Sequence, residues 1–206
     1  MDKTVQKIKP QQEVSSSNIN KKSFFYPPGG ILIWIVIYLE LFTFGMAIAG
    51  LAYYGSQERT LFHQHSQLLN KTIAAINTVF LLTGGYFAAR AVHHFKEGFF
   101  DKTSRFLLWA IFSGLGFLIL KLVEYRPKLE AGFTIDYSSF FMNYWLLTGF
   151  HWLHVLVGVA ILFFIRRAIQ KQKEKASLED IEAGTAFWHM CDLIWLLLFP
   201  ILYLLF

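Results

Sequence analysis

Five segments of the chain consist almost entirely of apolar residues, and short polar stretches separate them. Each is about 20 residues or longer, which is the length that a helix needs to cross the ~30 Å hydrocarbon core of a bilayer. The pattern predicts transmembrane helices at approximately residues 31–54, 71–92, 104–125, 140–165 and 185–206. We therefore expect an all-α, polytopic membrane protein, in which five helices form one bundle with short loops.

The composition indicates that lipid is the solvent for most of this chain. Of its 206 residues, 55% are hydrophobic and only 16% are charged, whereas a soluble domain carries roughly 25% charged residues. Residues 1–29 differ, because they are rich in Lys, Gln, Ser and Asn and lack the apolar centre of a signal peptide. We expect them to form a disordered cytoplasmic tail, separate from a transmembrane domain of residues 30–206.

The positive charges predict how the bundle is oriented. Of the 19 Lys and Arg residues, 14 lie before the first span or around the second and fourth connections between spans. The other five belong to the alternate connections: Arg59, Lys71, Lys121, Arg126 and Lys128. Because cytoplasmic loops carry the excess of Lys and Arg, the N-terminus is predicted to be cytoplasmic and Phe206 periplasmic. This distribution accounts for the net charge of +5 without a nucleic-acid partner.

Glu40 is the only acid or base in the first predicted span. An ionised carboxylate at this depth costs at least ~2.5 kcal/mol even on the mildest insertion scale. One interpretation is a structural or lipid-facing acid, protonated and hydrogen-bonded to a backbone carbonyl. The alternative is a proton relay, although only Tyr38 and Thr43 lie nearby to continue it. The structural interpretation is the one we expect.

Histidines and an acid mark the fourth and fifth spans. His151 and His154 are three residues apart, as are His189 and Asp192, so each pair shares a helix face. We predict one structural polar cluster of His151, His154, His189 and Asp192, joined by Glu124 of the third span. Metal or haem ligation is the alternative, and unequal depths argue against it. At 1.5 Å per residue from the cytoplasmic ends, His154 lies at ~16 Å, His151 at ~21 Å and His189 at ~6–8 Å.

Three further side chains are candidates for interactions at the membrane surface. Glu124 lies at the far end of the third span, and Lys121 precedes it by three residues, so an interfacial ion pair within the helix is one interpretation. A functional role for Glu124 is the alternative, and the sequence does not decide between the two. His93 and His94 lie at the cytoplasmic end of the second span, where we expect contacts with lipid headgroups. The stretch between the first and second spans is expected to be a loop.

Several motifs together resemble subunit III of the haem–copper respiratory oxidases. Residues 148–155 read T-G-F-H-W-L-H-V, which is similar to the family's most specific motif, T-G-F-H-x-x-H-V. Residues 187–195 contain W-H-x-x-D-x-x-W, and residues 77–94 resemble the family helix that begins N-T and ends H-H. Residues 124–136 resemble its E-Y…F-T-I-x-D stretch. Glu40 falls where the family often carries an intramembrane carboxylate.

The resemblance implies a subunit with no catalytic, cofactor-binding or metal-ligating residues of its own. Haem and copper would belong to a partner subunit, with oxidase subunit I directly beside this chain and subunit II and further small subunits in the complex. The resemblance also implies phospholipid bound in a cleft between helix groups, and a role in sustaining proton uptake during turnover. The five-span form resembles the shorter bacterial members, which implies the bacterial cytoplasmic (inner) membrane as the location.

Three alternatives to an oxidase subunit stay open at this stage. Short five-helix relatives also accompany bacterial nitric oxide reductases, and the shared motifs do not decide the electron donor or acceptor. A self-standing proton channel or transporter would use Glu40 and the His residues as a relay. The sequence disfavours a transporter, because it shows neither inverted repeats nor helices broken in mid-membrane. A haem-binding cytochrome b is a third class, which a visible absorption spectrum would distinguish.

Overall fold

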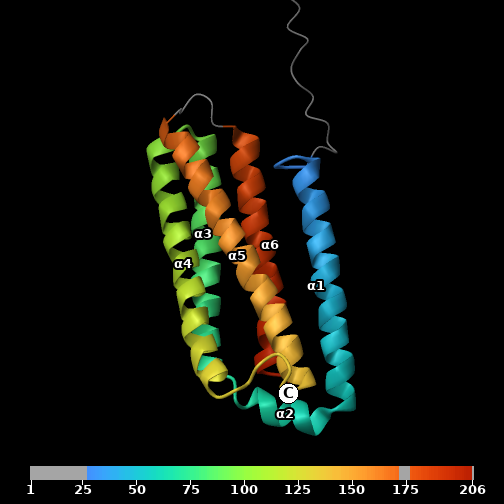
Figure 1. Cartoon of the computed structure of the whole chain (residues 1–206). Coiled ribbons are helices and arrows are strands. Elements are labelled where there is room, and N and C mark those ends of the chain that lie inside the picture. The colour runs from blue at the N-terminus through green and yellow to red at the C-terminus, as the bar shows by residue number, and fades with distance from the viewer. Residues whose placement is uncertain (1–26, 172–176, 206) are drawn as a thin grey trace, which may run out of the picture.

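The computed structural model describes residues 27–171 and 177–205, and within these ranges it contains six helices and no strand (Figure 1). The helices are α1 (Ile31–Gln57), α2 (Arg59–Ser66), α3 (Lys71–Lys96), α4 (Phe100–Glu130), α5 (Ser139–Lys171) and α6 (Leu178–Tyr203). All except α2 are long and apolar enough to cross a membrane. The predicted all-α fold with five spanning helices is therefore confirmed. The predicted tail falls almost wholly outside the described residues.

The five long helices run up and down through one bundle, each antiparallel to the next in the chain (Figure 1). We call its two ends the Ile31 end, where α1 begins, and the Tyr203 end, where α6 stops. The helices extend beyond the predicted spans; α6, for example, begins at Leu178 rather than near residue 185. Hydropathy detects only the apolar part of a helix, whereas backbone hydrogen bonding continues through charged turns outside the hydrocarbon.

The connection after α1 is helical, although a loop was expected there. α2 has only eight residues, and it buries Phe62 completely. The Phe62 ring packs edge-on against Phe140 at the start of α5, with ring centroids 5.3 Å apart. His65 also faces α5, because its Nδ1 lies 3.0 Å from the hydroxyl of Ser138. Such a short helix is stabilised by these contacts rather than by its own propensity.

The centre of the bundle is organised around Trp188 of α6, whose indole is completely buried. A Cβ atom added at Gly84 of α3 would lie 2.8 Å from this indole, and one at Gly114 of α4 would lie 2.4 Å from it. Both distances are shorter than van der Waals contact, so a larger residue at either position would displace the ring. The two glycines thus let α3 and α4 approach α6 closely, as small residues do in membrane bundles.

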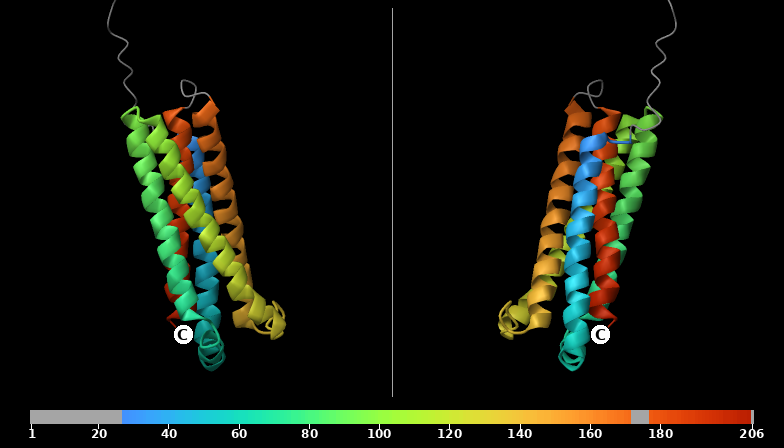
Figure 2. Two further views of the ribbon diagram at one scale, coloured as in Figure 1. Left: turned by 90° about the vertical axis from the view of Figure 1, so that its left-hand side faces the viewer. Right: turned by 90° about the vertical axis from the view of Figure 1, so that its right-hand side faces the viewer.

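α1 is attached differently from the other spans. It lies on the outside of α5 and α6, away from α4 (Figure 2). Most of its residues are exposed, and large apolar residues such as Leu32, Phe42 and Met46 are 78%, 69% and 61% exposed. Apolar exposure on this scale is expected on a helix that faces lipid or another membrane chain.

Candidate functional site

The most extensive polar contact among the described residues surrounds Glu124, near the Tyr203 end of α4. Its Oε2 accepts a hydrogen bond from Lys121 Nζ at 2.8 Å. Its Oε1 accepts from Lys128 Nζ at 3.0 Å, from the Tyr144 hydroxyl at 3.0 Å and from the Tyr203 hydroxyl at 2.7 Å. The Glu124 side chain is only 1% exposed. We call these five residues the Glu124 network.

Lys121 lies inside this network with a completely buried side chain. Besides Glu124, its ammonium donates to the Tyr203 hydroxyl at 2.6 Å. Four aromatic rings surround it, with centroids between 5.1 and 5.3 Å from Nζ: Tyr125, Tyr144, Trp195 and Tyr203. Aromatic faces carry negative electrostatic potential, so this arrangement replaces part of the hydration that the ammonium loses on burial.

The local sequence explains how α4 supplies three charges to one place. Lys121, Glu124 and Lys128 are spaced three and four residues apart, so they share one helix face. Tyr144 comes from the first turns of α5 and Tyr203 from the last turn of α6. All four groups that face the carboxylate can donate hydrogen bonds, an arrangement that favours the ionised form of Glu124. The network therefore holds together the ends of three helices by charge-assisted hydrogen bonds.

A second polar contact joins α1 to α5 near the middle of the membrane span. Glu40 Oε2 lies 3.2 Å from His154 Nε2, with the two side chains 21% and 13% exposed. The other ring nitrogen, Nδ1, lies 2.8 Å from the carbonyl oxygen of Phe150, to which it donates. The Nε2 atom therefore faces the Glu40 carboxyl, although Glu40 Oε2 has no hydrogen-bond partner among the described residues. The contact is a close approach between a carboxyl and an imidazole that belong to different helices.

His151 lies in a different environment, although it is on the same helix as His154. Its ring is completely buried and stacks on Trp195 at 5.3 Å, with Phe117 edge-on at 5.7 Å. Neither ring nitrogen has a hydrogen-bond partner among the described residues. His151 thus acts mainly as an aromatic packing residue between α4, α5 and α6.

His189 and Asp192 form a pair on α6 that faces α3. His189 Nδ1 lies 3.2 Å from Asp192 Oδ2, and Asp192 is buried while His189 is 48% exposed. A Cβ atom at Gly85 of α3 would lie 2.2 Å from Asp192 Oδ2, so a larger residue there would displace this carboxyl from its present position. Close by, the Trp195 indole donates to the Thr78 hydroxyl at 2.9 Å, which adds a second polar link between α3 and α6.

Comparison with known proteins assigns this arrangement to a family. The family model described as cytochrome c oxidase subunit III matches residues 31–205. The chain belongs to the cytochrome c oxidase subunit III family. Among curated proteins named cytochrome c oxidase subunit 3, that of Drosophila melanogaster is 33% identical over 132 residues, covering 64% of this chain and 49% of the relative. That of Artemia franciscana is 35% identical over 130 residues, covering 63% and 49%.

A third relative of the same name, from Prototheca wickerhamii, is 34% identical over 146 residues, covering 66% of this chain and 52% of the relative. The chain thus spans about half the length of the curated relatives that it matches.

The structure of this subunit III family member corrects the prediction of one polar cluster. His154 pairs with Glu40, His189 pairs with Asp192, and Glu124 belongs to a separate network. The predicted difference in depth is also wrong, because the His154 ring stacks on Phe187, only two residues before His189, at 6.4 Å. His154 of α5 faces α1, whereas His189 of α6 faces α3. The two histidines are therefore separated by the directions in which they point and not by their depths.

Two further expectations about acids are wrong. Glu40 is not a lone carboxyl, since His154 of α5 faces it. The pair of Lys121 and Glu124 forms, as one interpretation of the sequence predicted, but it is buried inside the bundle rather than at the interface. Sequence reasoning missed Lys128, although its spacing of four residues from Glu124 was a usable signal. It also missed Tyr144 and Tyr203, which no local spacing connects with Glu124.

At the Ile31 end, the two histidines of α3 share one acid. His93 Nε2 lies 3.4 Å from Glu97 Oε1, and His94 Nδ1 lies 3.2 Å from Glu97 Oε2. His94 is buried and stacks on Phe106 at 5.1 Å, whereas His93 is exposed. Contact with lipid headgroups therefore stays a prediction for His93, and the His94 ring faces the protein. Within residues 27–171 and 177–205, no three His, Cys, Asp or Glu side chains gather as a metal site.

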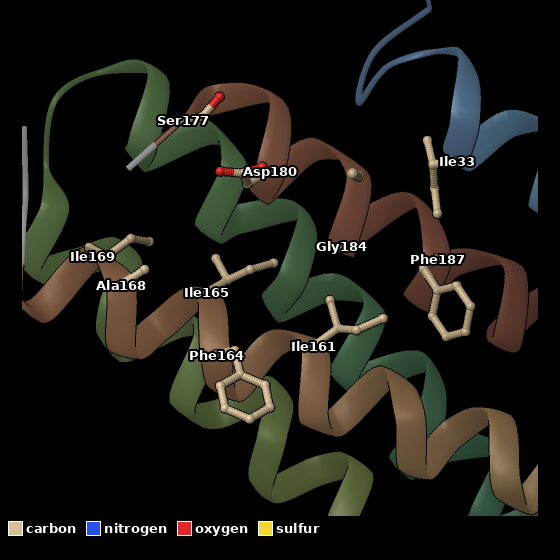
Figure 3. Close-up of a pocket in the computed structure, with 11 residues that line it drawn as sticks. Ile33, Ile161, Phe164, Ile165, Ala168, Ile169, Ser177, Asp180, Gly184 and Phe187 are labelled. Atoms are coloured by element: carbon tan, nitrogen blue, oxygen red, sulfur yellow. The ribbon is translucent and has the colours of Figure 1, made fainter. Parts of the chain in front are cut away.

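An apolar groove of about 440 Å³ opens between α1, α5 and α6 toward the Ile31 end (Figure 3). Ile33 of α1, Ile161 and Ile165 of α5 and Phe187 of α6 line it. Asp180 lies near one end of the groove, in the first turn of α6. The groove exists because α1 stands apart from the tightly packed helices.

Proposed function

We propose that this chain is a non-redox accessory subunit III of a bacterial haem–copper terminal oxidase, of the cytochrome c or quinol type. It packs directly beside subunit I, in a complex that also contains subunit II and further small subunits. Haem and copper belong to a partner subunit and not to this chain. The observation that carries the proposal is that two acids of the spans, Glu124 and Glu40, contact side chains of other helices of the same chain. The family is that of an oxidase subunit, and in this bundle these acids join its own helices. Such a bundle is suited to stabilise the catalytic subunit beside it.

Copurification tests this assignment most directly. The tagged chain, extracted in mild detergent, is expected to bring with it a large subunit that contains haem and copper and consumes oxygen. Recovery with a nitric oxide reductase would instead assign the chain to that complex. Recovery alone, with proton conductance in vesicles, would favour a self-standing channel and contradict the proposal.

Phospholipid binding is supported by the groove between α1, α5 and α6. Its lining is almost wholly apolar, and about 440 Å³ is enough for part of an acyl chain. Replacing Gly184, which lines the groove, is unsuitable as a test, because a Cβ there would meet Ile165 at 2.4 Å. Ile33→Trp, which fills the groove from α1, should reduce the lipid that copurifies. Leu32→Trp, on the exposed side of α1, should not.

A role in sustaining proton uptake is supported by the pair of Glu40 and His154. The pair brings a carboxyl and an imidazole within 3.2 Å, but it contains no redox centre, so its loss cannot remove an electron-transfer step. Glu40→Gln should leave the initial rate of oxygen consumption within about threefold of normal and accelerate inactivation during turnover. Complete loss of the initial rate in a fully assembled Glu40→Gln complex would contradict this role and favour an obligatory relay.

The proposed location is the bacterial inner membrane, with the N-terminus in the cytoplasm and the C-terminus in the periplasm. The asymmetry of positive charge between the two ends of the bundle supports this orientation. Lys121 and Lys128 are buried, so they do not add positive charge to the surface of the Tyr203 end, and the asymmetry becomes larger. The remaining basic residues at the Tyr203 end are only Arg59, Lys71 and Arg126 among those described. Reporter fusions at the two ends of the chain test the orientation, and a cytoplasmic C-terminus would contradict it.

A further inference from the structure

The Glu124 network contains more positive than negative charge. Glu124 is one carboxylate, whereas Lys121 and Lys128 are two ammonium groups, and all three side chains are buried. Among the described residues, Glu124 is the one acid within ion-pair distance of either lysine, and Glu130 of the same helix pairs instead with the exposed Arg126 at 2.8 Å. Within the described residues, one buried positive charge therefore has no counter-ion. Such a charge is expensive in a low-dielectric environment.

A cavity of about 300 Å³ reaches this excess charge from the surface of the Tyr203 end. Lys128 and Glu124 lie at its inner wall, and Ile73, Pro127 and Phe133 are among the residues that complete it. Lys128 Nζ donates to the Glu124 carboxylate at 3.0 Å and to the Glu124 backbone carbonyl at 3.2 Å. An ammonium has three protons, and these two hydrogen bonds use two of them.

The beginning of α3 adds further positive potential to the same cavity. Asn70 caps this helix, with its side-chain oxygen accepting from the Ile73 backbone N–H at 3.0 Å. Asn70 and Ile73 both line the cavity. The positive end of the dipole of a 26-residue helix therefore lies beside the buried lysine.

From this geometry we propose that the cavity is a binding site for a phosphate group, and that Lys128 is the side chain that mainly binds it. The phosphate charge compensates the excess positive charge of the Glu124 network, and Glu124 itself stays neutralised by its four donors. The cavity lies at the membrane surface, where the phosphate of an anionic lipid or free inorganic phosphate can reach it. It is far from the apolar groove near the Ile31 end, so either site can exist without the other.

The test uses the intact complex in nanodiscs of phosphatidylcholine. Phosphatidylglycerol or inorganic phosphate is added at constant ionic strength, and binding is followed by native mass spectrometry and by the melting temperature of this subunit. Lys128→Gln should weaken binding about tenfold or more, because it removes the charge-assisted hydrogen bond. The matched control is Arg126→Gln, which removes an exposed positive charge two residues away and should change binding by less than about twofold.

Ile73→Phe is the second variant, because it narrows the cavity and leaves every charge in place. It should also weaken binding about tenfold, so the proposal can be judged even if Lys128→Gln does not fold. Binding of phosphatidylglycerol without inorganic phosphate would support a lipid phosphate as the ligand, and competition between the two would support a general phosphate site. Absence of binding by both, or equal binding by all three variants, would overturn the proposal.

Discussion

Glu124 and Glu40 are both carboxyl groups in apolar helices, yet the structure treats them in opposite ways. Glu124 is 1% exposed and accepts hydrogen bonds from four side chains that belong to three helices. Glu40 is 21% exposed and faces one ring nitrogen, that of His154. Four donors surround the Glu124 carboxylate, whereas Glu40 has one close polar neighbour. The number of polar partners, more than the depth in the membrane, therefore distinguishes an acid that ties several helices together from one that contacts a single neighbour.

The largest effect is expected for Glu124→Gln. The change leaves Lys121 and Lys128 buried without a carboxylate, and removing one partner of a buried ion pair costs ~3–5 kcal/mol. The free energy of unfolding, measured by denaturant titration in detergent, should fall by about that amount. Glu130→Gln, which breaks the exposed pair with Arg126, should cost less than ~1 kcal/mol. Similar losses in the two variants would mean that the Glu124 network does not stabilise the bundle.

A smaller loss is expected for Lys121→Met, because Glu124 then retains three of its donors. The lost hydrogen bond joins two charged groups, so the free energy of unfolding should fall by ~1.5–3 kcal/mol. The same titration measures it, with Glu124→Gln as the reference. Equal or greater destabilisation by Lys121→Met would show that the buried ammonium, and not the carboxylate, is the centre of the network.

The interaction energy between Glu40 and His154 should be smaller than the energies expected for the Glu124 network. A double-mutant cycle with Glu40→Gln and His154→Leu should give an interaction energy of ~0.6 kcal/mol, the usual size of a polar contact between membrane helices. The variants are compared by the same unfolding measurement. A coupling energy above ~2 kcal/mol would indicate a fixed ion pair like that of Glu124 and would remove the contrast between the two acids.

The smallest effect is expected for His65, which lies outside the spanning helices. Burial lowers the pKa of His65 below its ordinary value of 6.5. The unfolded chain then binds more protons than the folded chain below about pH 6.5, so stability should fall as the pH decreases through this range. His65→Gln should reduce the dependence on pH, as seen in melting temperatures between pH 5 and pH 8. An unchanged pH profile would show that His65 does not contribute.

Hydropathy predicted the five spans because membrane crossing imposes a length and an apolar composition that can be recognised locally. Local spacing also predicted the pair of Lys121 and Glu124. The partners Tyr144 and Tyr203 could not be predicted in this way, because their approach to Glu124 depends on where α5 begins and α6 ends. Helix ends were also the least accurate part of the prediction. The depth of His189 was counted from a predicted helix start near residue 185, whereas α6 begins at Leu178, so the predicted depth was too small.

The single cluster failed for a related reason. Residues spaced three apart share a helix face, but spacing does not specify which neighbouring helix that face meets. His154 faces α1, whereas His189 faces α3, and this choice is made by glycines such as Gly85 that allow close approach. The rotation of each helix in the bundle therefore depends on tertiary packing, which a single sequence does not reveal.

The loose attachment of α1 has a consequence for how the protein is made. α1 is synthesised before every other helix, but its partners across the bundle, α5 and α6, are synthesised after all the rest. At ~5–20 residues per second, His154 follows Glu40 out of the ribosome only after roughly ten seconds. During that interval Glu40 has no imidazole to face, and an ionised acid in lipid would cost at least ~2.5 kcal/mol. The newly made helix must therefore carry this carboxyl in its neutral form, or wait beside the insertion machinery, until the histidine arrives.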